Sequence, residues 1–335
     1  MGEEVQGNEE IFTVKKLEPV LLGPAFQTYE GIYFLSNLDQ PLAYIIETVY
    51  CFRGEASQST GEVLKEALAK VLVYYYPLAG TLMRGSDGKL VVRCPGEGVV
   101  FVEAIAEHEM EVLGDITMPD PVKLKKLVHT FPETMDIVQL PLLTVQLAQL
   151  RRTAMEDNAI KNCSTFVALS AFIWRFQSKA LRMRPNQETR LLFTVDGRSR
   201  FNPTLPKGFF GNGIIFAHCS CSAGELIEKP LSFAVRMVQE AIKVVNEDHL
   251  RSLIDHLEVT RASYPTAANN LLISDWSRLS FSGTDFGWGV PLQSGLASPP
   301  IIVLFLPFGE ERKCINVLMC LPAPAMETFQ KLMVM

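Results

Sequence analysis

Apolar residues along this chain gather in two patterns, stripes at helical spacing and short continuous runs, which predict alternating helices and strands. The clearest predicted helix begins at Ser59, which forms a capping box with Glu62, and it ends before Pro77. In front of that helix, the apolar and β-branched run 43–52 predicts a buried strand. Behind it, turn residues separate two further predicted strands, at 90–92 and 99–102.

The second part of the chain repeats this alternation. An apolar helix is predicted with Ser164 or Thr165 as its N-cap, another enters at Pro230, and one more ends the chain. Apolar runs predict strands at 191–195, 214–221, 271–274, 301–306 and 315–319. The pattern turns polar after a short predicted strand at 142–145, so we place the boundary there, with residues 1–150 and 151–335 as two α/β halves.

The composition is that of an ordinary globular chain. Its 335 residues are 48% apolar and 20% charged, enough for about two domains. A net charge of −6 argues against nucleic acid as a partner, because phosphate binding needs clustered lysine and arginine. The longest apolar run, 301–306, is far shorter than the ~20 residues of a membrane-spanning helix, and the acidic start is no secretory signal. Seven scattered cysteines are typical of a reducing compartment, so we expect a cytoplasmic protein.

Several common catalytic and binding motifs are absent from the sequence. It contains no phosphate-binding P-loop and no Gly-x-Ser-x-Gly elbow, and Gly211 and Gly213 lack the third glycine of a dinucleotide fingerprint. His218 and Cys219 are neighbours on a predicted strand, so their side chains face opposite sides of the sheet. We therefore expect packing there and no metal site.

Three motifs, in a fixed order, carry a family resemblance. They are Tyr76-Pro77-Leu78-Ala79-Gly80, Asp196-Gly197-Arg198 and Asp285-Phe286-Gly287-Trp288-Gly289. Together they resemble the plant BAHD family of acyl-CoA-dependent acyltransferases, and the last motif is the most specific. The resemblance covers the chain from about residue 12 to its end. The stretches 31–39 and 224–230 resemble the family members that act on ω-hydroxy fatty acids and fatty alcohols.

The resemblance implies a fold and an activity. The fold is two chloramphenicol-acetyltransferase-like α/β domains with mixed sheets, of which the N-terminal one is incomplete. The activity is transfer of a hydroxycinnamoyl group, such as feruloyl, from CoA to the hydroxyl of an ω-hydroxy fatty acid or fatty alcohol, as in suberin and wax esters. The implied partners are an acyl-CoA co-substrate and a hydroxylated lipid, with no bound cofactor, no metal and a monomeric state.

The family's catalytic motif, His-x-x-x-Asp-Gly, does not occur in this sequence. In relatives it lies between the strand that begins at 142–145 and the helix that begins at Thr165, and here only about twenty residues separate them. The motif histidine resembles a general base, worth ~10²–10⁴ in rate, so we expect impaired catalysis. His129, followed by Glu133, is the nearest to a histidine–acid pair, but its loop contains Pro132, and we expect a solvated side chain.

Two other interpretations remain open at this point. The chain is either a non-catalytic member that binds an acyl-CoA or lipid, or a truncated product without a function. Removal of a central strand would leave its neighbours with unpaired backbone groups, each costing ~1–3 kcal/mol when buried. The chain would then either pair its strands anew or stay open.

The resemblance also assigns residues. Trp288 is a candidate donor to the oxyanion, although packing of its ring is the simpler expectation. Asp285 is expected to form a buried bridge with Arg198, two surface charges being the alternative, in a structural motif that includes Gly287 and Gly289. Candidates on the acyl-CoA and substrate side are Asp196, Gly211 and Asn212.

Overall fold

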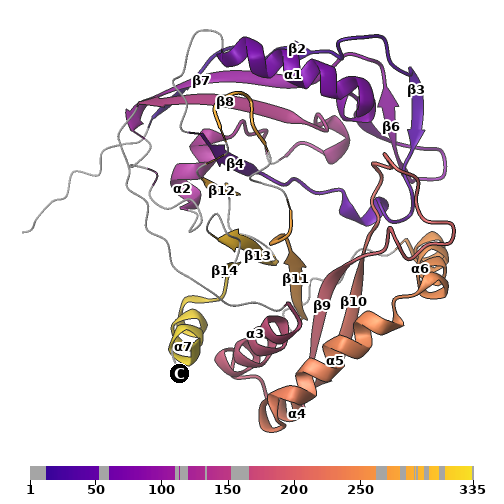
Figure 1. The fold of residues 1–335 in the computed structure, drawn as a ribbon, viewed down its shortest axis with the longest axis vertical. Helices are drawn as coiled ribbons and strands as arrows, with labels where there is room; N and C mark the ends of the chain where they lie inside the picture. Colours follow the sequence, from indigo (N-terminus) through magenta and orange to yellow (C-terminus); the bar gives the residue numbers. More distant parts are fainter. Residues whose placement is uncertain are drawn as a thin grey trace, which may run out of the picture.

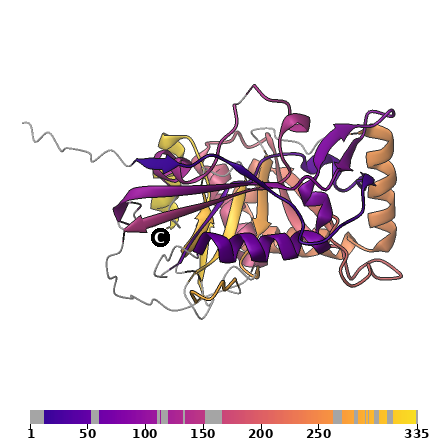
Figure 2. The same ribbon diagram turned by 90° about the horizontal axis from the view of Figure 1, so that it is seen from above.

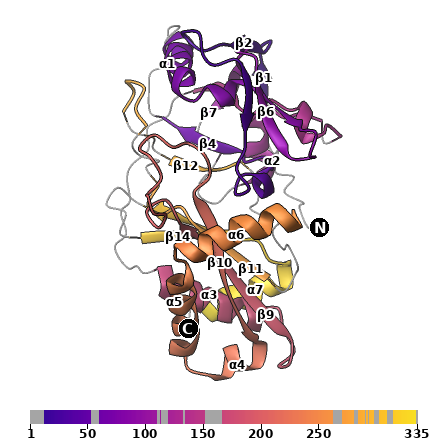
Figure 3. The same ribbon diagram turned by 90° about the vertical axis from the view of Figure 1, so that its right-hand side faces the viewer.

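A computed structural model describes most of the chain. The described residues are 13–52, 60–109, 113, 120–132, 134–151, 166–261, 270–279, 284–289, 291, 293–297, 302–308 and 314–333. They form two α/β halves, which Figure 3 shows one above the other. The proposed cap residues Ser59, Ser164 and Thr165 lie outside the described part.

The C-terminal half is built on one mixed sheet. Its order is β10 (Ile214–Ser222), β9 (Glu188–Asp196), β11 (Asn270–Asp275), β13 (Val303–Phe308) and β14 (Cys314–Leu318). The outer pairs are antiparallel, and β11 is parallel to both of its neighbours. These strands lie where the apolar runs predict them, because both faces of the central strands are buried.

Helices cover one face of this sheet (Figure 1). They are α3 (Phe166–Ala180), α4 (Ala223–Glu228), α5 (Leu231–Val244) and α7 (Ala323–Met333). Pro230 is the N-cap of α5, as the sequence predicts. Fully buried Trp174 on α3 donates a 2.9 Å hydrogen bond from its indole nitrogen to the Thr189 hydroxyl on β9, so the largest core side chain leaves no polar atom unpaired.

The described strands of the N-terminal half form three separate sheets. In the first, β7 (Val99–Glu109) pairs along one edge with β1 (Val14–Lys16) and β2 (Val20–Leu22), and along the other, in parallel, with β8 (Thr144–Arg151). Figure 2 shows β7 and β8 as two long strands side by side. The second sheet has the order β3 (Gly31–Phe34), β6 (Leu90–Cys94), β5 (Thr81–Arg84). The third pairs β4 (Thr48–Cys51) with β12 (Gln293–Leu296).

Two helices belong to this half, α1 (Thr60–Tyr74) and the short α2 (Pro121–Leu124). The helix α1 packs beside β7 (Figure 1), where Lys65 forms a 2.7 Å ion pair with Glu103. The Tyr76–Ala79 segment forms a 3-10 turn directly behind α1, and Pro77 in it is buried. Predicted strands at 90–92 and 99–102 are confirmed, while the strand predicted at 142–145 continues to Arg151.

The buried strand predicted at 43–52 is wrong in two respects. Only Thr48–Cys51 is a strand, and its side chains alternate between exposed and buried. Tyr44, Ile45 and Ile46 are 51%, 62% and 52% exposed, so this apolar run is not core. These residues line a cavity, and an apolar cavity wall has the same composition as a buried strand.

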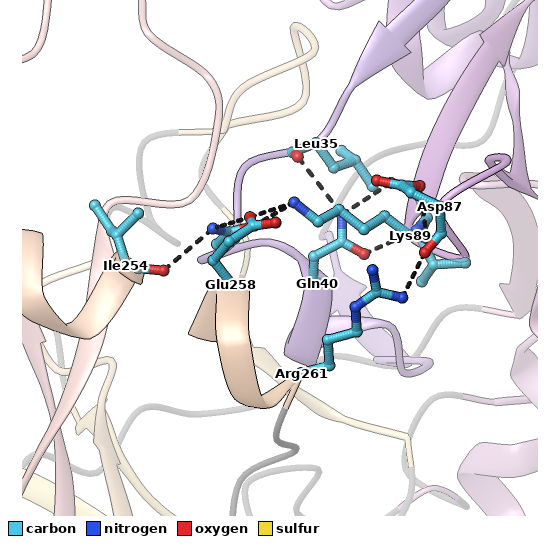
Figure 4. A network of polar contacts seen from close by, with 9 residues as sticks. Leu35, Gln40, Asp87, Lys89, Ile254, Glu258 and Arg261 are labelled. Carbon is cyan, nitrogen blue, oxygen red and sulfur yellow. Dashed lines mark hydrogen bonds and ion pairs between the residues drawn. The ribbon is translucent and has the colours of Figure 1, made fainter. Parts of the chain in front are cut away.

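The boundary at residue 150 stays a prediction, because β12 comes from the second half and pairs with β4 of the first. A second link is the α6 clasp, which we define as Asn37, Lys89, Glu258 and Arg261; Figure 4 labels the last three of these. The helix α6 (Glu247–Thr260) carries Glu258, whose carboxylate accepts from the Lys89 ammonium and, at 2.8 Å, from the Asn37 amide. Arg261 donates to the Asp87 carbonyl oxygen.

Candidate functional site

A cavity of about 1310 Å³ lies between the two halves. The first half supplies most of its wall, from residues 42–52, the loop 127–132 and residues 140–148. The second half contributes Phe210, Gly211, Thr284, Phe286 and Trp288. Of the residues predicted from the family resemblance, Gly211 and Trp288 therefore reach this cavity.

Three aromatic rings form one part of the wall. The Phe52 ring lies 5.8 Å from that of Phe286 and 5.9 Å from that of Trp288, centroid to centroid, both nearly edge-on. The Phe286 and Trp288 rings are 5.5 Å apart. Half-buried Trp288 thus packs against aromatic neighbours and also faces the cavity. Its role as an oxyanion donor stays a prediction.

The loop that carries Trp288 is shaped by its own aspartate. The Asp285 Oδ1 atom accepts hydrogen bonds from the backbone N–H groups of Gly287, at 2.7 Å, and Gly289, at 3.1 Å. Both glycines have positive φ angles, +94° and +82°, which residues with a β-carbon rarely adopt. Aspartate and two glycines at this spacing therefore hold the two aromatic side chains between them against the cavity.

The buried bridge predicted between Asp285 and Arg198 does not form. Arg198 instead pairs with Asp196, two residues before it, at 3.2 Å, and its backbone N–H donates to the same carboxylate. The side chains of this pair are 50% and 58% exposed, so the pair lies on the surface. Asp285 is itself exposed. Each charged side chain interacts within its own loop. Asp285 accepts from backbone N–H groups nearby, and Arg198 pairs with a side chain two residues away.

Asn212 occupies a structural position. Its Nδ2 donates to the carbonyl oxygens of Leu38, at 2.9 Å, and Ile214, at 3.0 Å, and its Oδ1 accepts from the Ile214 N–H. Its backbone N–H donates to Asp39 at 2.9 Å. Asn212 thus joins the two halves beside the cavity wall. Asp196, engaged with Arg198, is not among the described residues that line the cavity.

His129 is more buried than the solvated side chain that the sequence predicts. It is half-buried, it lines the cavity, and its ring packs edge-on against Phe131 with centroids 5.0 Å apart. Burial, together with the Lys16 ammonium, lowers the pKa of His129 below its ordinary 6.5. The imidazole is therefore neutral at pH 7 and able to accept a proton. Its predicted partner Glu133 lies outside the described residues.

The interpretation of the 218–221 segment is supported by the packing. Cys219 and Cys221 pack against the core of the C-terminal half, whereas His218 is exposed. Burial raises the pKa of the Cys219 thiol to about 12 and that of Cys221 to about 11, so both stay protonated. Within the part of the chain that the structure describes, no cluster of three His, Cys, Asp or Glu side chains is arranged to hold a metal.

Comparison with known proteins assigns the family. The model of the Transferase family matches residues 12–155 and 146–334, which together span nearly the whole chain. The chain belongs to this family, that of the BAHD acyltransferases. The family match comes in two pieces, which meet at 146–155, within and just beyond β8.

Two curated relatives of this BAHD chain come from Arabidopsis thaliana. Omega-hydroxypalmitate O-feruloyl transferase is 39% identical, over 98% of this chain and 94% of the relative. Fatty alcohol:caffeoyl-CoA acyltransferase is 35% identical, over 96% of this chain and 98% of the relative. The first alignment spans 430 positions, and the chain has 335 residues, so about a hundred of those positions have no residue here.

Solved structures show the same fold. Vinorine synthase aligns with a TM-score of 0.72 at 18% identity, over 94% of this chain and 96% of its own. TRI101 from F. sporotrichioides, solved with coenzyme A and T-2, aligns with a TM-score of 0.67 at 15% identity, over 90% of this chain and 97% of its own. The mixed α/β fold predicted from the sequence is confirmed. None of the described helices is long and apolar enough to cross a membrane.

The sequence did not single out most of the cavity wall. Phe52 and Tyr44 were assigned to a buried strand, and Phe286 was read only as part of a family motif. For Phe52 and Tyr44, the signal is the length of the apolar run before α1, which exceeds the four residues that form β4.

Proposed function

We propose that this chain binds a hydroxycinnamoyl-type acyl-CoA and a hydroxylated lipid in the cavity between its halves, and that it transfers the acyl group to the lipid hydroxyl at a reduced rate. The observation that carries the proposal is the cavity itself. It lies between the two halves of an acyltransferase fold, and its wall is mostly apolar, with aromatic rings at one side. A small number of polar groups in such a wall is typical of a site for a largely apolar ligand.

The acyl group and the lipid each have a complementary part of the cavity wall. The cluster of Phe52, Phe286 and Trp288 offers faces and edges to an aromatic acyl group. The side chains of Ile45 and Ile46 offer apolar surface to an alkyl chain. The relatives named for feruloyl and caffeoyl transfer to ω-hydroxypalmitate and fatty alcohols support this pairing of substrates.

The reduced rate follows from the sequence. Without His-x-x-x-Asp-Gly, the usual general base is absent, which costs ~10²–10⁴ in rate. About a hundred positions of the first alignment have no residue here, and the family match divides into two pieces that overlap at 146–155, so both observations support loss of a segment near the end of β8. Among the described histidines, His129 alone lines the cavity, and its neutral imidazole is the substitute base we propose.

The remaining roles belong to the same proposal. Attack of the lipid hydroxyl on the thioester carbonyl creates an oxyanion, and we assign its stabilisation to the indole N–H of Trp288, a residue of the cavity wall. Gly211, which lines the cavity, is assigned to the substrate side in the same proposal. Acyl-CoA acts as co-substrate, with no bound cofactor and no metal. The monomeric state and the cytoplasmic location predicted from the sequence are also part of the proposal.

Two other functions have an observation in their favour. A binding role without catalysis is favoured by a large cavity in a chain that lacks the motif. A truncated product without function is favoured by the division of the N-terminal half into three small sheets.

The test uses purified protein with feruloyl-CoA and 16-hydroxypalmitate, and measures release of free CoA beside a full-length relative. We expect slow release that depends on the acceptor. Turnover equal to that of the relative would contradict a reduced rate. Saturable binding of feruloyl-CoA without any release would favour the binding role, and failure of the chain to melt cooperatively would favour the truncated product.

A further inference from the structure

Two backbone carbonyl groups next to His129 are held by side chains of the first sheet. Lys16, on β1, donates from its ammonium group to the Val128 carbonyl oxygen at 2.7 Å. This carbonyl belongs to the peptide bond that joins Val128 to His129. Gln146, on β8, donates from its Nε2 to the Leu127 carbonyl oxygen at 2.7 Å. Since β1 and β8 pair with opposite edges of β7, one sheet holds the backbone of His129 from two of its strands.

Lys16 also brings a positive charge to the imidazole of His129. The Val128 carbonyl oxygen accepts its hydrogen bond but, being uncharged, does not neutralise the ammonium group. Burial is the larger cause of the lowered pKa of His129, and the Lys16 ammonium adds to it, because a second positive charge nearby disfavours the protonated ring. The hydrogen bond and the charge of one lysine therefore act on the same histidine.

The other charged groups of this region partly cancel one another. Lys125, in the 3-10 turn before His129, forms a 2.7 Å ion pair with the Glu47 carboxylate. Burial lowers the pKa of the Lys16 ammonium, Glu47 raises it and Lys125 lowers it, so the two members of the ion pair act on Lys16 in opposite senses. The remaining charged residues of the same segment are Lys126 and, outside the described residues, Glu133. Among the described groups, Lys16 is the one whose charge lowers the pKa of His129.

We propose that Lys16 is a positioning residue for acyl transfer: it fixes the peptide bond in front of His129 and, by its charge, keeps the imidazole in the neutral form that accepts the proton of the lipid hydroxyl. This role rests on the proposed function, in which His129 is the general base. Only an unprotonated imidazole takes up a proton as the hydroxyl attacks the thioester. Lys16 is not among the described residues that line the cavity, so it acts through His129 and not on the substrate.

The first measurement is an NMR titration of the histidine rings in the full chain, which needs no turnover. His129→Ala identifies the signal of this residue among the five histidines. Lys16→Met removes the charge and the donor but keeps a long side chain, so we expect the pKa of His129 to rise. Lys16→Arg restores charge and donor, and the pKa should return toward its value in the unchanged chain. Lys15→Met is the matched control, because Lys15 is also exposed but points to the other face of β1, and it should leave the pKa unchanged.

The second measurement is CoA release from feruloyl-CoA with 16-hydroxypalmitate as the acceptor, over a range of pH. In Lys16→Met, loss of the hydrogen bond that fixes the ring should lower kcat about fivefold at pH 8, the effect of one lost hydrogen bond, and leave KM nearly unchanged. Because the pKa of His129 rises in this variant, the ring becomes protonated at a higher pH, and the rate should begin to fall at a higher pH as well. Lys16→Arg should restore both kcat and the pH profile.

The two measurements separate the role of Lys16 from the acyl-transfer activity. An unchanged pKa of His129 in Lys16→Met would overturn the role, whether or not the chain releases CoA. A raised pKa with an unchanged pH profile of CoA release would also overturn it, because the group that Lys16 acts on would then not be the base. A raised pKa and a pH profile that moves with it support both the role and the activity. A raised pKa in a chain that releases no CoA supports the effect of Lys16 on His129 and counts against the proposed function.

Discussion

The two halves of this molecule differ in how they bury their apolar residues. The C-terminal half has one five-stranded sheet, and most of its buried side chains form one large core that runs from Trp174 through Phe193 to Phe305, beside a small cluster around Leu304. The N-terminal half has three small sheets, and its buried residues divide into small separate clusters, among them those around Leu72 and Leu82. The cavity lies in the divided half and at its border.

This difference shows what one continuous sheet contributes. In the C-terminal half, each strand completes hydrogen bonds of the next, and most inner side chains meet a neighbour on the same core. In the N-terminal half, the described strands belong to three sheets, the buried side chains fall into separate clusters, and some of them border the cavity. A void removes packing partners from the atoms around it, so equal side chains stabilise the two halves unequally.

The strongest test of this contrast is one substitution made in each half. Leu191→Ala, in the fully buried centre of β9, should lower the free energy of unfolding by about 4–5 kcal/mol, because the core cannot collapse around the new cavity. Leu82→Ala, at a residue that already borders the cavity, should cost about 2 kcal/mol. Urea denaturation of both variants measures the difference, and equal losses would contradict the contrast.

A second test concerns the chemistry of the divided half. His129→Ala should lower the remaining CoA release about 10²-fold, since a general base contributes at least that much. His218→Ala, which changes an exposed histidine of the C-terminal half, should leave the rate unchanged. Because the pKa of His129 lies below 6.5, the base stays unprotonated as pH falls from 8 to 6.5, and the rate should decline only below that pH. An identical rate of CoA release in both variants would exclude His129 as the general base.

A substitution in the loop of Asp285 should have a smaller effect on stability. Gly287→Ala should destabilise the chain by about 1–2 kcal/mol, because φ is +94° there and a β-carbon disfavours it. No described atom lies within 4 Å of the new carbon, so the cost is one of backbone conformation alone. Gly23→Ala, in the N-terminal half and outside the positive-φ region, is the matched control and should be close to neutral. Calorimetric melting of both variants compares them.

The smallest effect concerns the α6 clasp between the halves. Hydrogen bonds from Lys89 and then Asn37 lower the pKa of the exposed Glu258 carboxylate. A lowered folded-state pKa means that the stabilisation is present above the ordinary value of 4.5 and is lost as pH falls through the folded-state pKa. Lys89→Met should therefore lower the melting temperature slightly at pH 7 and not at pH 3, and 1 M salt should reduce the difference. Lys243→Met is the control, because it breaks an ion pair within α5 and should leave the contact between the halves unchanged.

The sequence predicted the C-terminal half better than the N-terminal half, for a physical reason. Its strands are buried on both faces, so short apolar runs mark them directly, as at β9 and β13. The helix α6 was not predicted, because it is more polar overall than the other helices, and Leu250 and Leu257 are its buried residues. In the N-terminal half, the run 43–52 was read as core, since hydrophobicity alone does not distinguish a core from a cavity wall.

The sequence also predicted only part of the site. Trp288 and Gly211 line the cavity, and the family motifs pointed to both. The bridge from Asp285 to Arg198 was wrong, because a charged side chain takes the nearest partner, and sequence distance does not reveal which group that is. His129 was assigned to solvent, since the Phe131 ring and the cavity that surround it are fixed only by the tertiary structure.

The pairing of β12 with β4 has a consequence for synthesis on the ribosome. The two strands are about 245 residues apart along the chain, so β4 has no partner until residue 296 has left the exit tunnel. At ~5–20 residues per second, this interval is on the order of 10–50 s, during which the N-terminal half lacks its third sheet. The first half to be translated therefore stays incomplete until most of the second half has also been made.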